Sequence, residues 1–164
     1  MNEDIKPKKV NKKVKFLVCV DDTEQSKVAL RVACLKAKKA GGLVDMLHVI
    51  EPADFQGLFS VAEKMSIDNR EEAEKLLQGF ASEAQDWAGI IPTLLVREGG
   101  VKEQIFEAIK EDPSISLLVV GVAPKSRINR ELLDSLADHL GDKLMIPIMA
   151  VPGNLTYQQI ENLC

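Results

Sequence analysis

The fold of this chain is decided by residues 117–136, LLVVGVAPKSRINRELLDSL. The stretch opens with an apolar run, Leu117–Val122, which predicts a strand buried on both faces of a parallel sheet. It closes with leucines at helical spacing that continue to Leu140, which predicts a packed helix over about residues 129–140. The polar loop between them follows the carboxyl end of the strand, where open α/β sheets bind their ligands.

The rest of the chain repeats this alternation. Further strands are predicted at residues 14–21, 43–50, 93–98 and 145–151, and further helices at 24–40, 69–88, 101–111 and 157–163. The alternation predicts a doubly wound α/β fold with a parallel sheet. A loop is expected from Glu51 to about Asp68, followed by a helix that Asn69 caps. Pro147 predicts that the last strand lies at an edge or begins there.

Length and composition indicate one domain. The 164 residues, 46% of them hydrophobic, are enough for a sizeable core. Residues 1–13 are basic and are predicted to be a disordered tail, whereas residues 14–164 form the domain. The longest apolar runs have the length of strands, so neither a membrane partner nor a secretory signal is expected. The net charge of −4 does not favour nucleic acid as a partner.

The cysteines bear on the cell compartment. Cys19, Cys34 and Cys164 are widely spaced and form neither a C-x-x-C motif nor a cluster with metal-ligand spacing, so no metal is expected. Cys19 falls in an apolar run and Cys34 in a helical pattern, which predicts buried free thiols. Free thiols are typical of a reducing compartment, and a cytoplasmic location is therefore predicted.

The deciding stretch resembles the nucleotide signature of the universal stress protein family, Gly-x2-Gly-x9-Gly-Ser/Thr, which wraps the ribose and phosphates of ATP in nucleotide-binding members. Gly121 matches the first glycine and Ser135 the terminal hydroxyl, whereas Pro124 and Asp134 stand at the other two glycine positions. The resemblance covers about residues 15–152. It implies a five-stranded sheet of order 3-2-1-4-5, of the adenine-nucleotide α-hydrolase-like type, with a ligand crevice between strands one and four.

Two strand ends extend the resemblance. Asp21 follows the first strand and matches a family aspartate near the adenine, and Val49 matches a residue that backs the ring. A ligand-free alternative stays open, in which Asp21 and Asp22 are favourable charges at a helix N-terminus. The nucleotide site implied by the resemblance comprises Cys19, Val20, Asp21, Val49, Val120, Gly121, Ala123, Pro124, Asp134, Ser135 and Leu136.

The changed glycine positions predict that ATP binds weakly or not at all. Pro124 has no N–H to give to a phosphate, and the carboxylate of Asp134 repels one. Three basic side chains of the same segment argue the other way, as candidate phosphate contacts: Lys125, Arg127 and Arg130. The cofactor is therefore left unknown, with ATP or AMP as the candidates.

The family pairs its comparable last strand with the same strand of a second subunit. The resemblance thus implies a homodimer through Ile146, Ile148, Met149, Ala150 and Val151, which would cover an apolar sheet edge. An unidentified protein partner is also open.

Three functions remain. The predicted one is a non-catalytic, dimeric stress-response regulator with an altered pocket, and the alternatives are an ATP- or AMP-binding switch and, last, a slow ATPase. Ser135 and His139 share a helix face, but they have no orienting acid or oxyanion hole, so no catalytic residue is predicted.

Overall fold

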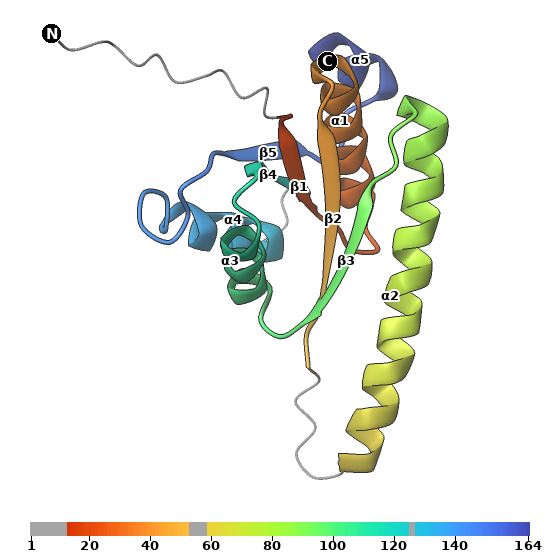
Figure 1. Ribbon diagram of the computed structural model, residues 1–164, viewed down its shortest axis with the longest axis vertical. Coiled ribbons are helices and arrows are strands. Elements are labelled where there is room, and N and C mark those ends of the chain that lie inside the picture. Colours follow the sequence, from red (N-terminus) through yellow and green to blue (C-terminus); the bar gives the residue numbers. More distant parts are fainter. Residues whose placement is uncertain (1–12, 53–58, 125–126) are drawn as a thin grey trace, which may run out of the picture.

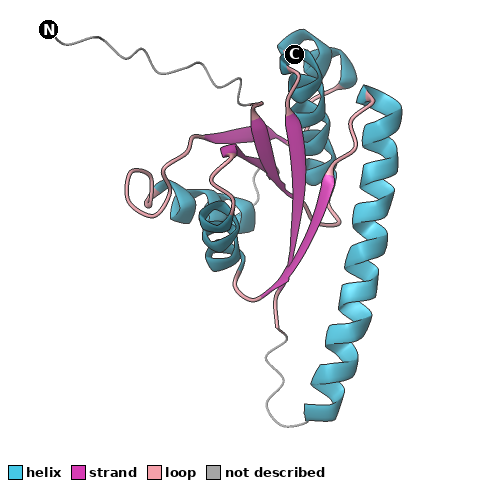
Figure 2. Ribbon diagram, in the orientation of Figure 1, coloured by secondary structure: helices cyan, strands magenta, loops and turns pink. Residues whose placement is uncertain are grey.

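The computed structural model describes residues 13–52, 59–124 and 127–164, with only the backbone described at 59–68 and 127–129. A central sheet lies between two layers of helices (Figure 1, Figure 2). The sheet has the order β3-β2-β1-β4-β5, and every neighbouring pair is parallel. Its strands are β1 (Lys15–Cys19), β2 (Leu43–Ile50), β3 (Thr93–Glu98), β4 (Ile115–Val122) and β5 (Ile148–Pro152). The predicted fold and strand order are confirmed.

The strand from the deciding stretch is central, as predicted. In β4, Leu117 lies opposite Phe16 of β1 and Val120 lies opposite Cys19. The buried side chains of the two strands point alternately into two cores, one on each face of the sheet. Two adjacent strands without polar side chains at these positions suit only the middle of a sheet that is covered on both faces.

Each core has its own helices. One face is covered by α1 (Glu24–Ala40), α2 (Phe59–Ala88) and α5 (Tyr157–Leu163). The other is covered by α3 (Val101–Glu111) and α4 (Arg127–Ala137). Helix α1 approaches the sheet closely because its inner residues are small, and Gly41 ends it at a φ of 65°.

Three predicted boundaries were wrong by three residues or more. Helix α2 begins at Phe59, so the predicted loop is shorter and Asn69 lies inside the helix. Residues 59–68 contain no Gly or Pro, so no residue in them breaks the helix. Strand β5 begins after Pro147, whose ring cannot donate to a ladder, but its edge position is confirmed. Helix α4 ends at Ala137, because Leu140 instead forms a bridge with Leu144.

Two predicted segments lie partly outside the residues that the structure describes. The predicted tail is described only from residue 13, and residues 53–58 of the predicted loop are not described. Among the described residues, no helix is both long enough and apolar enough to cross a membrane.

A charged cluster joins the amino-terminal parts of β1 and β2 to Asp112, the residue that ends α3. The Lys15 ammonium lies 2.6 Å from Asp112 Oδ2 and 3.7 Å from Asp45 Oδ2. Asp45 is only 4% exposed, and this burial raises the pKa of its carboxyl against the opposing effect of Lys15. The hydrogen bond from Lys15 lowers the pKa of Asp112 and raises that of Lys15 itself. Lys15 therefore compensates a buried carboxylate, to which Thr93 adds a side-chain hydrogen bond.

Candidate functional site

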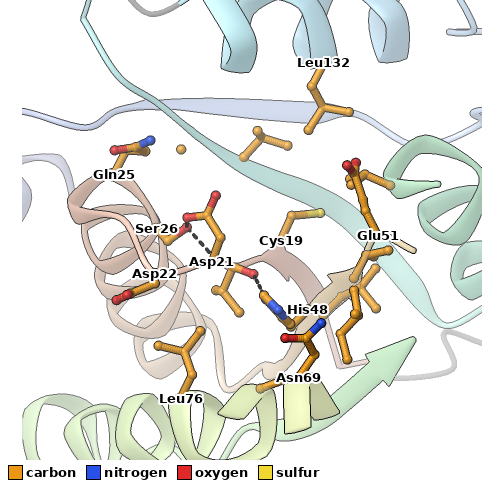
Figure 3. Close-up of a pocket in the computed structure, with 18 of the residues that line it drawn as sticks. Cys19, Asp21, Asp22, Gln25, Ser26, His48, Glu51, Asn69, Leu76 and Leu132 are labelled. Atoms are coloured by element: carbon orange, nitrogen blue, oxygen red, sulfur yellow. Dashed lines mark hydrogen bonds between the residues drawn. The ribbon is translucent and has the colours of Figure 1, made fainter. Parts of the chain in front are cut away.

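A large cleft opens where the ends of β1, β2 and β4 meet (Figure 3). Strand order reverses between β1 and β4, and such switch points are where α/β sheets bind ligands. The cleft has a volume of about 1040 Å³. Its wall includes strand ends, the first turn of α1, one side of α2 and the middle of α4. This space is large enough for a nucleotide-sized ligand.

Asp21 belongs to the start of α1 as well as to the cleft. Its Oδ1 accepts a hydrogen bond from Ser26 Oγ at 2.7 Å, and the Thr23 hydroxyl also donates to it. The Asp21 N–H in turn donates to Ser26 Oγ at 2.9 Å, and Thr23 caps the helix by accepting from the Ser26 N–H. The local bonds of the ligand-free alternative are therefore present, although Asp21 also lines the cleft (Figure 3).

Two side chains with catalytic potential, His48 and Cys19, line the cleft. His48 Nδ1 lies 2.8 Å from the Val20 carbonyl oxygen, so this nitrogen must carry a proton and donate it there, which leaves Nε2 as the nitrogen with the free lone pair. Burial, with Asp21 adding to it, raises the pKa of the Cys19 thiol to about 12. A thiol with that pKa stays protonated at neutral pH and is a poor nucleophile.

The charge of the cleft is strongly one-sided. Among the described residues of the lining, a single amine, Lys75, stands against five carboxylates: Asp21, Asp22, Glu51, Glu72 and Glu131. These acids come from the β1–α1 turn, the end of β2, α2 and α4. Of these five acids, sequence reasoning placed only Asp21 in the site and named Asp22 only as a charge at the start of a helix. It missed Glu51, Glu72 and Glu131, because no local pattern joins positions so far apart. Of these three, only Glu51, directly after a strand, carried a local signal.

Gly121 lies in the cleft wall for a reason of packing. A Cβ at this position would lie 2.7 Å from the Gln25 carbonyl carbon and nearer still to its oxygen. Gly153, after β5, faces the same residue, and a Cβ there would lie 3.0 Å from Gln25 Cα. The first turn of α1 thus rests directly on two glycines. This close approach is by itself a sufficient reason for glycine at position 121, so the match to the nucleotide signature does not require a bound nucleotide.

The residues predicted to form one nucleotide site lie in different places. Cys19, Val20, Asp21, Val49, Val120 and Gly121 line the cleft. Ala123, Pro124, Arg130 and Asp134 line a second cavity of about 490 Å³ against β5. Leu136 is fully buried in the core, and Ser135 lines neither of these two cavities. Lys125 and the side chain of Arg127 lie outside the described residues.

The residues predicted for subunit contact lie at the β5 edge. Ile148 and Met149 are half-buried, and Ala150 is exposed. Ile146 precedes the strand and is half-buried. Val151 is only 3% exposed and points into the core, so its side chain cannot meet a partner.

Comparison with known proteins gives one consistent result. The model of the universal stress protein family matches residues 14–152. Universal stress protein UspA from Lactobacillus plantarum has a TM-score of 0.72 at 17% identity, covering 84% of this chain and 97% of that chain. A protein of the same family from Burkholderia pseudomallei has a TM-score of 0.69 at 20% identity, covering 87% and 98%. One from Arabidopsis thaliana, with AMP bound, has a TM-score of 0.56 at 17% identity, covering 85% and 91%. Among curated proteins, no sequence matches the chain.

Proposed function

Because this chain belongs to the universal stress protein family, we propose that it is a non-catalytic stress-response regulator whose cleft binds ATP weakly or not at all. The charge of the cleft carries this proposal. Two like charges about 4 Å apart repel by roughly 4 kcal/mol at an effective dielectric constant of about 20. A triphosphate that meets five carboxylates and one lysine would therefore be repelled strongly.

The cavity beside β5 has few groups that could bind phosphates. Pro124 has no N–H to donate, and Asp134 adds another carboxylate there, which Arg130 offsets in part. The altered glycine positions thus support the same proposal, but as residues of a neighbouring cavity. Neutralising acidic side chains of the cleft should then raise the affinity for ATP more than restoring the two glycines does.

Calorimetry tests this order of effects. The native protein should bind ATP with a Kd no tighter than about 1 mM. The triple variant Asp22→Asn, Glu72→Gln and Glu131→Gln should bind ATP at least about tenfold more tightly, because three repulsive charges are removed. The matched control is the double variant Pro124→Gly and Asp134→Gly, which should gain less. Micromolar binding of ATP by the native protein would refute the proposal.

An AMP-responsive switch is the alternative function. The related Arabidopsis thaliana structure holds AMP, and a monophosphate brings less negative charge into the cleft than ATP does. The same calorimeter distinguishes the two functions: micromolar AMP binding without ATP binding would favour the switch.

The non-catalytic part of the proposal is supported by the Cys19 thiol, which its raised pKa holds protonated. Phosphate release from ATP above that of a His48→Gln variant would contradict it. A cytosolic location is part of the same proposal and is supported by Cys19, Cys34 and Cys164, which are all free thiols.

We also propose that two copies pair through β5. Leu118 donates its N–H to the Pro147 carbonyl at 3.0 Å, and Gly153 donates to Val122 at 2.8 Å. Within residues 147–153, the odd-numbered residues thus direct their backbone N–H and C=O groups toward β4. The alternate residues, Ile148 and Ala150, direct theirs away from the sheet. Antiparallel pairing about a two-fold axis at Met149 would join Ile148 of each copy to Ala150 of the other.

The variant Ala150→Pro should separate the copies without unfolding either one. Proline removes the outward N–H, and it leaves the ladder to β4 intact because that ladder uses the neighbouring residues. Lost hydrogen bonds across the axis should weaken the dimer by about tenfold or more. Sedimentation equilibrium measures the change, and Ala150→Ser, which keeps the N–H, is the matched control. A native monomer at micromolar concentration would disprove the pairing.

A further inference from the structure

Arg31 is held between two aromatic rings at a distance from the cleft. Its guanidinium carbon lies 3.9 Å from the centroid of the Trp87 ring and 3.7 Å from that of the Tyr157 ring. The three residues come from α1, the last turn of α2 and the start of α5, elements that lie side by side in Figure 1. Both flat faces of the guanidinium are therefore covered, and its plane is fixed.

Arg31 lines a cavity of its own. The cavity has a volume of about 550 Å³ and is bounded by Val28, Leu155 and Ile160 in addition to the two rings. It lies on the other side of α1 from the cleft, since Glu24 and Lys27 line it whereas Gln25 and Ser26 line the cleft. It is therefore a separate site.

The charges around the cavity leave Arg31 available. Glu24 and Lys27 pair with each other at 3.4 Å. Within the described part of the chain, Arg31 makes no hydrogen bond or ion pair, and its contacts are the two rings. Glu83 also lines the cavity, so the lining as a whole is close to neutral. Selectivity must then come from the geometry of the N–H donors rather than from a general positive field.

That geometry is specific. A guanidinium carries five N–H donors in one plane, in a fork that matches the two oxygens of a carboxylate or phosphate. Stacking on both faces leaves the plane's edge as the only direction for polar contacts. Because the two rings already hold the fork in place, a ligand need not order it, which lowers the entropic cost of binding. We propose that the cavity beside Arg31 is a binding site separate from the cleft. It takes the carboxylate or phosphate group of a small ligand, whose apolar part lies against Val28, Leu155 and Ile160.

The chain has a built-in reporter for this site, because Trp87 is its only tryptophan. The full-length protein is titrated with inorganic phosphate and, separately, with hexanoate, at ionic strength held constant with sodium chloride, while the fluorescence of Trp87 is followed. A saturable change with either anion supports the site. Phosphate alone identifies a phosphate ligand, and hexanoate alone identifies a carboxylate ligand with an apolar tail. No saturable change with either one overturns the proposal.

Two variants show which groups are responsible. Arg31→Lys keeps the charge but loses the fork, and it should weaken binding by about tenfold or more. Arg70→Lys, on the exposed side of α2, is the matched control and should change nothing. Glu83→Gln removes a negative charge from the lining without touching the stack, and it should tighten binding severalfold even if Arg31→Lys loosens α5. Binding that is insensitive to both Arg31→Lys and Glu83→Gln would overturn the assignment to Arg31.

Discussion

Replacing Lys15 by methionine should lower the free energy of unfolding by about 3 kcal/mol, since the change leaves the buried Asp45 carboxylate without its cation. Methionine keeps most of the volume of the side chain, so the loss is electrostatic rather than a loss of packing. Asp112 loses a partner too, but it is more exposed and water can replace the ammonium there. Urea unfolding followed by Trp87 fluorescence measures the effect.

The matched control is Lys27→Met, which breaks the exposed pair with Glu24 and should cost less than about 0.5 kcal/mol. The double variant Lys15→Met and Asp45→Asn should recover most of the loss, because the amide needs no cation. A deficit of Lys15→Met below about 1 kcal/mol would show that Asp45 is compensated in another way.

The same variant should depend on pH with a defined sign. Burial raises the pKa of Asp45 in the folded protein, so folding favours its protonated form, and ionisation costs stability as the pH rises through the folded pKa. Removal of Lys15 raises that pKa further. The deficit of Lys15→Met should therefore be largest at neutral pH and shrink as the pH falls and Asp45 takes up a proton.

Replacing Gly121 by alanine should destabilise the protein by about 3 kcal/mol, at the upper end of what overpacking a core costs. The new methyl group would overlap the backbone carbonyl of Gln25, and backbone cannot turn aside as a long side chain can. Helix α1 must then move away from β4, which opens the core beneath Ala29. Urea unfolding again provides the measurement.

Gly79→Ala is the control with the opposite expected sign. Gly79 lies inside α2 with open space where its Cβ would be, so alanine should stabilise the helix by up to about 1 kcal/mol. Gly121 does not have a positive φ, so backbone strain does not contribute to its effect. A Gly121→Ala variant as stable as the native protein would show that α1 and β4 can separate at little cost.

The fold was predictable because its signals are local. Apolar strands, helical spacing and glycine stops are each visible within a few residues, and α1 and α3 begin and end where their patterns predict. The errors have physical reasons. Residues 59–68 hold no Gly or Pro that would stop α2 from beginning at Phe59, and Pro147 delays the start of β5.

The candidate site was predictable only where strand ends carry it. Asp21 follows the buried strand β1 and Val49 lies near the end of β2, where the family resemblance places both in the site. The acids Glu72 and Glu131 come from two helices on opposite faces of the sheet, and only the folded chain brings them to one cleft. The stacking of Trp87 and Tyr157 on Arg31 was not predictable for the same reason. In the sequence, Trp87 is one of several apolar residues at helical spacing, and only the fold brings α1 and α5 beside it.

The contact between Gly121 and Gln25 also bears on how such proteins diverge. A signature residue is normally taken as a trace of selection for its ligand, so its survival suggests that the ligand is still bound. Here the folding of α1 onto β4 would by itself select against any side chain at this position. A lineage that lost nucleotide binding would therefore keep this glycine while its other signature positions changed. It would still match the first position of the nucleotide signature of its ancestors.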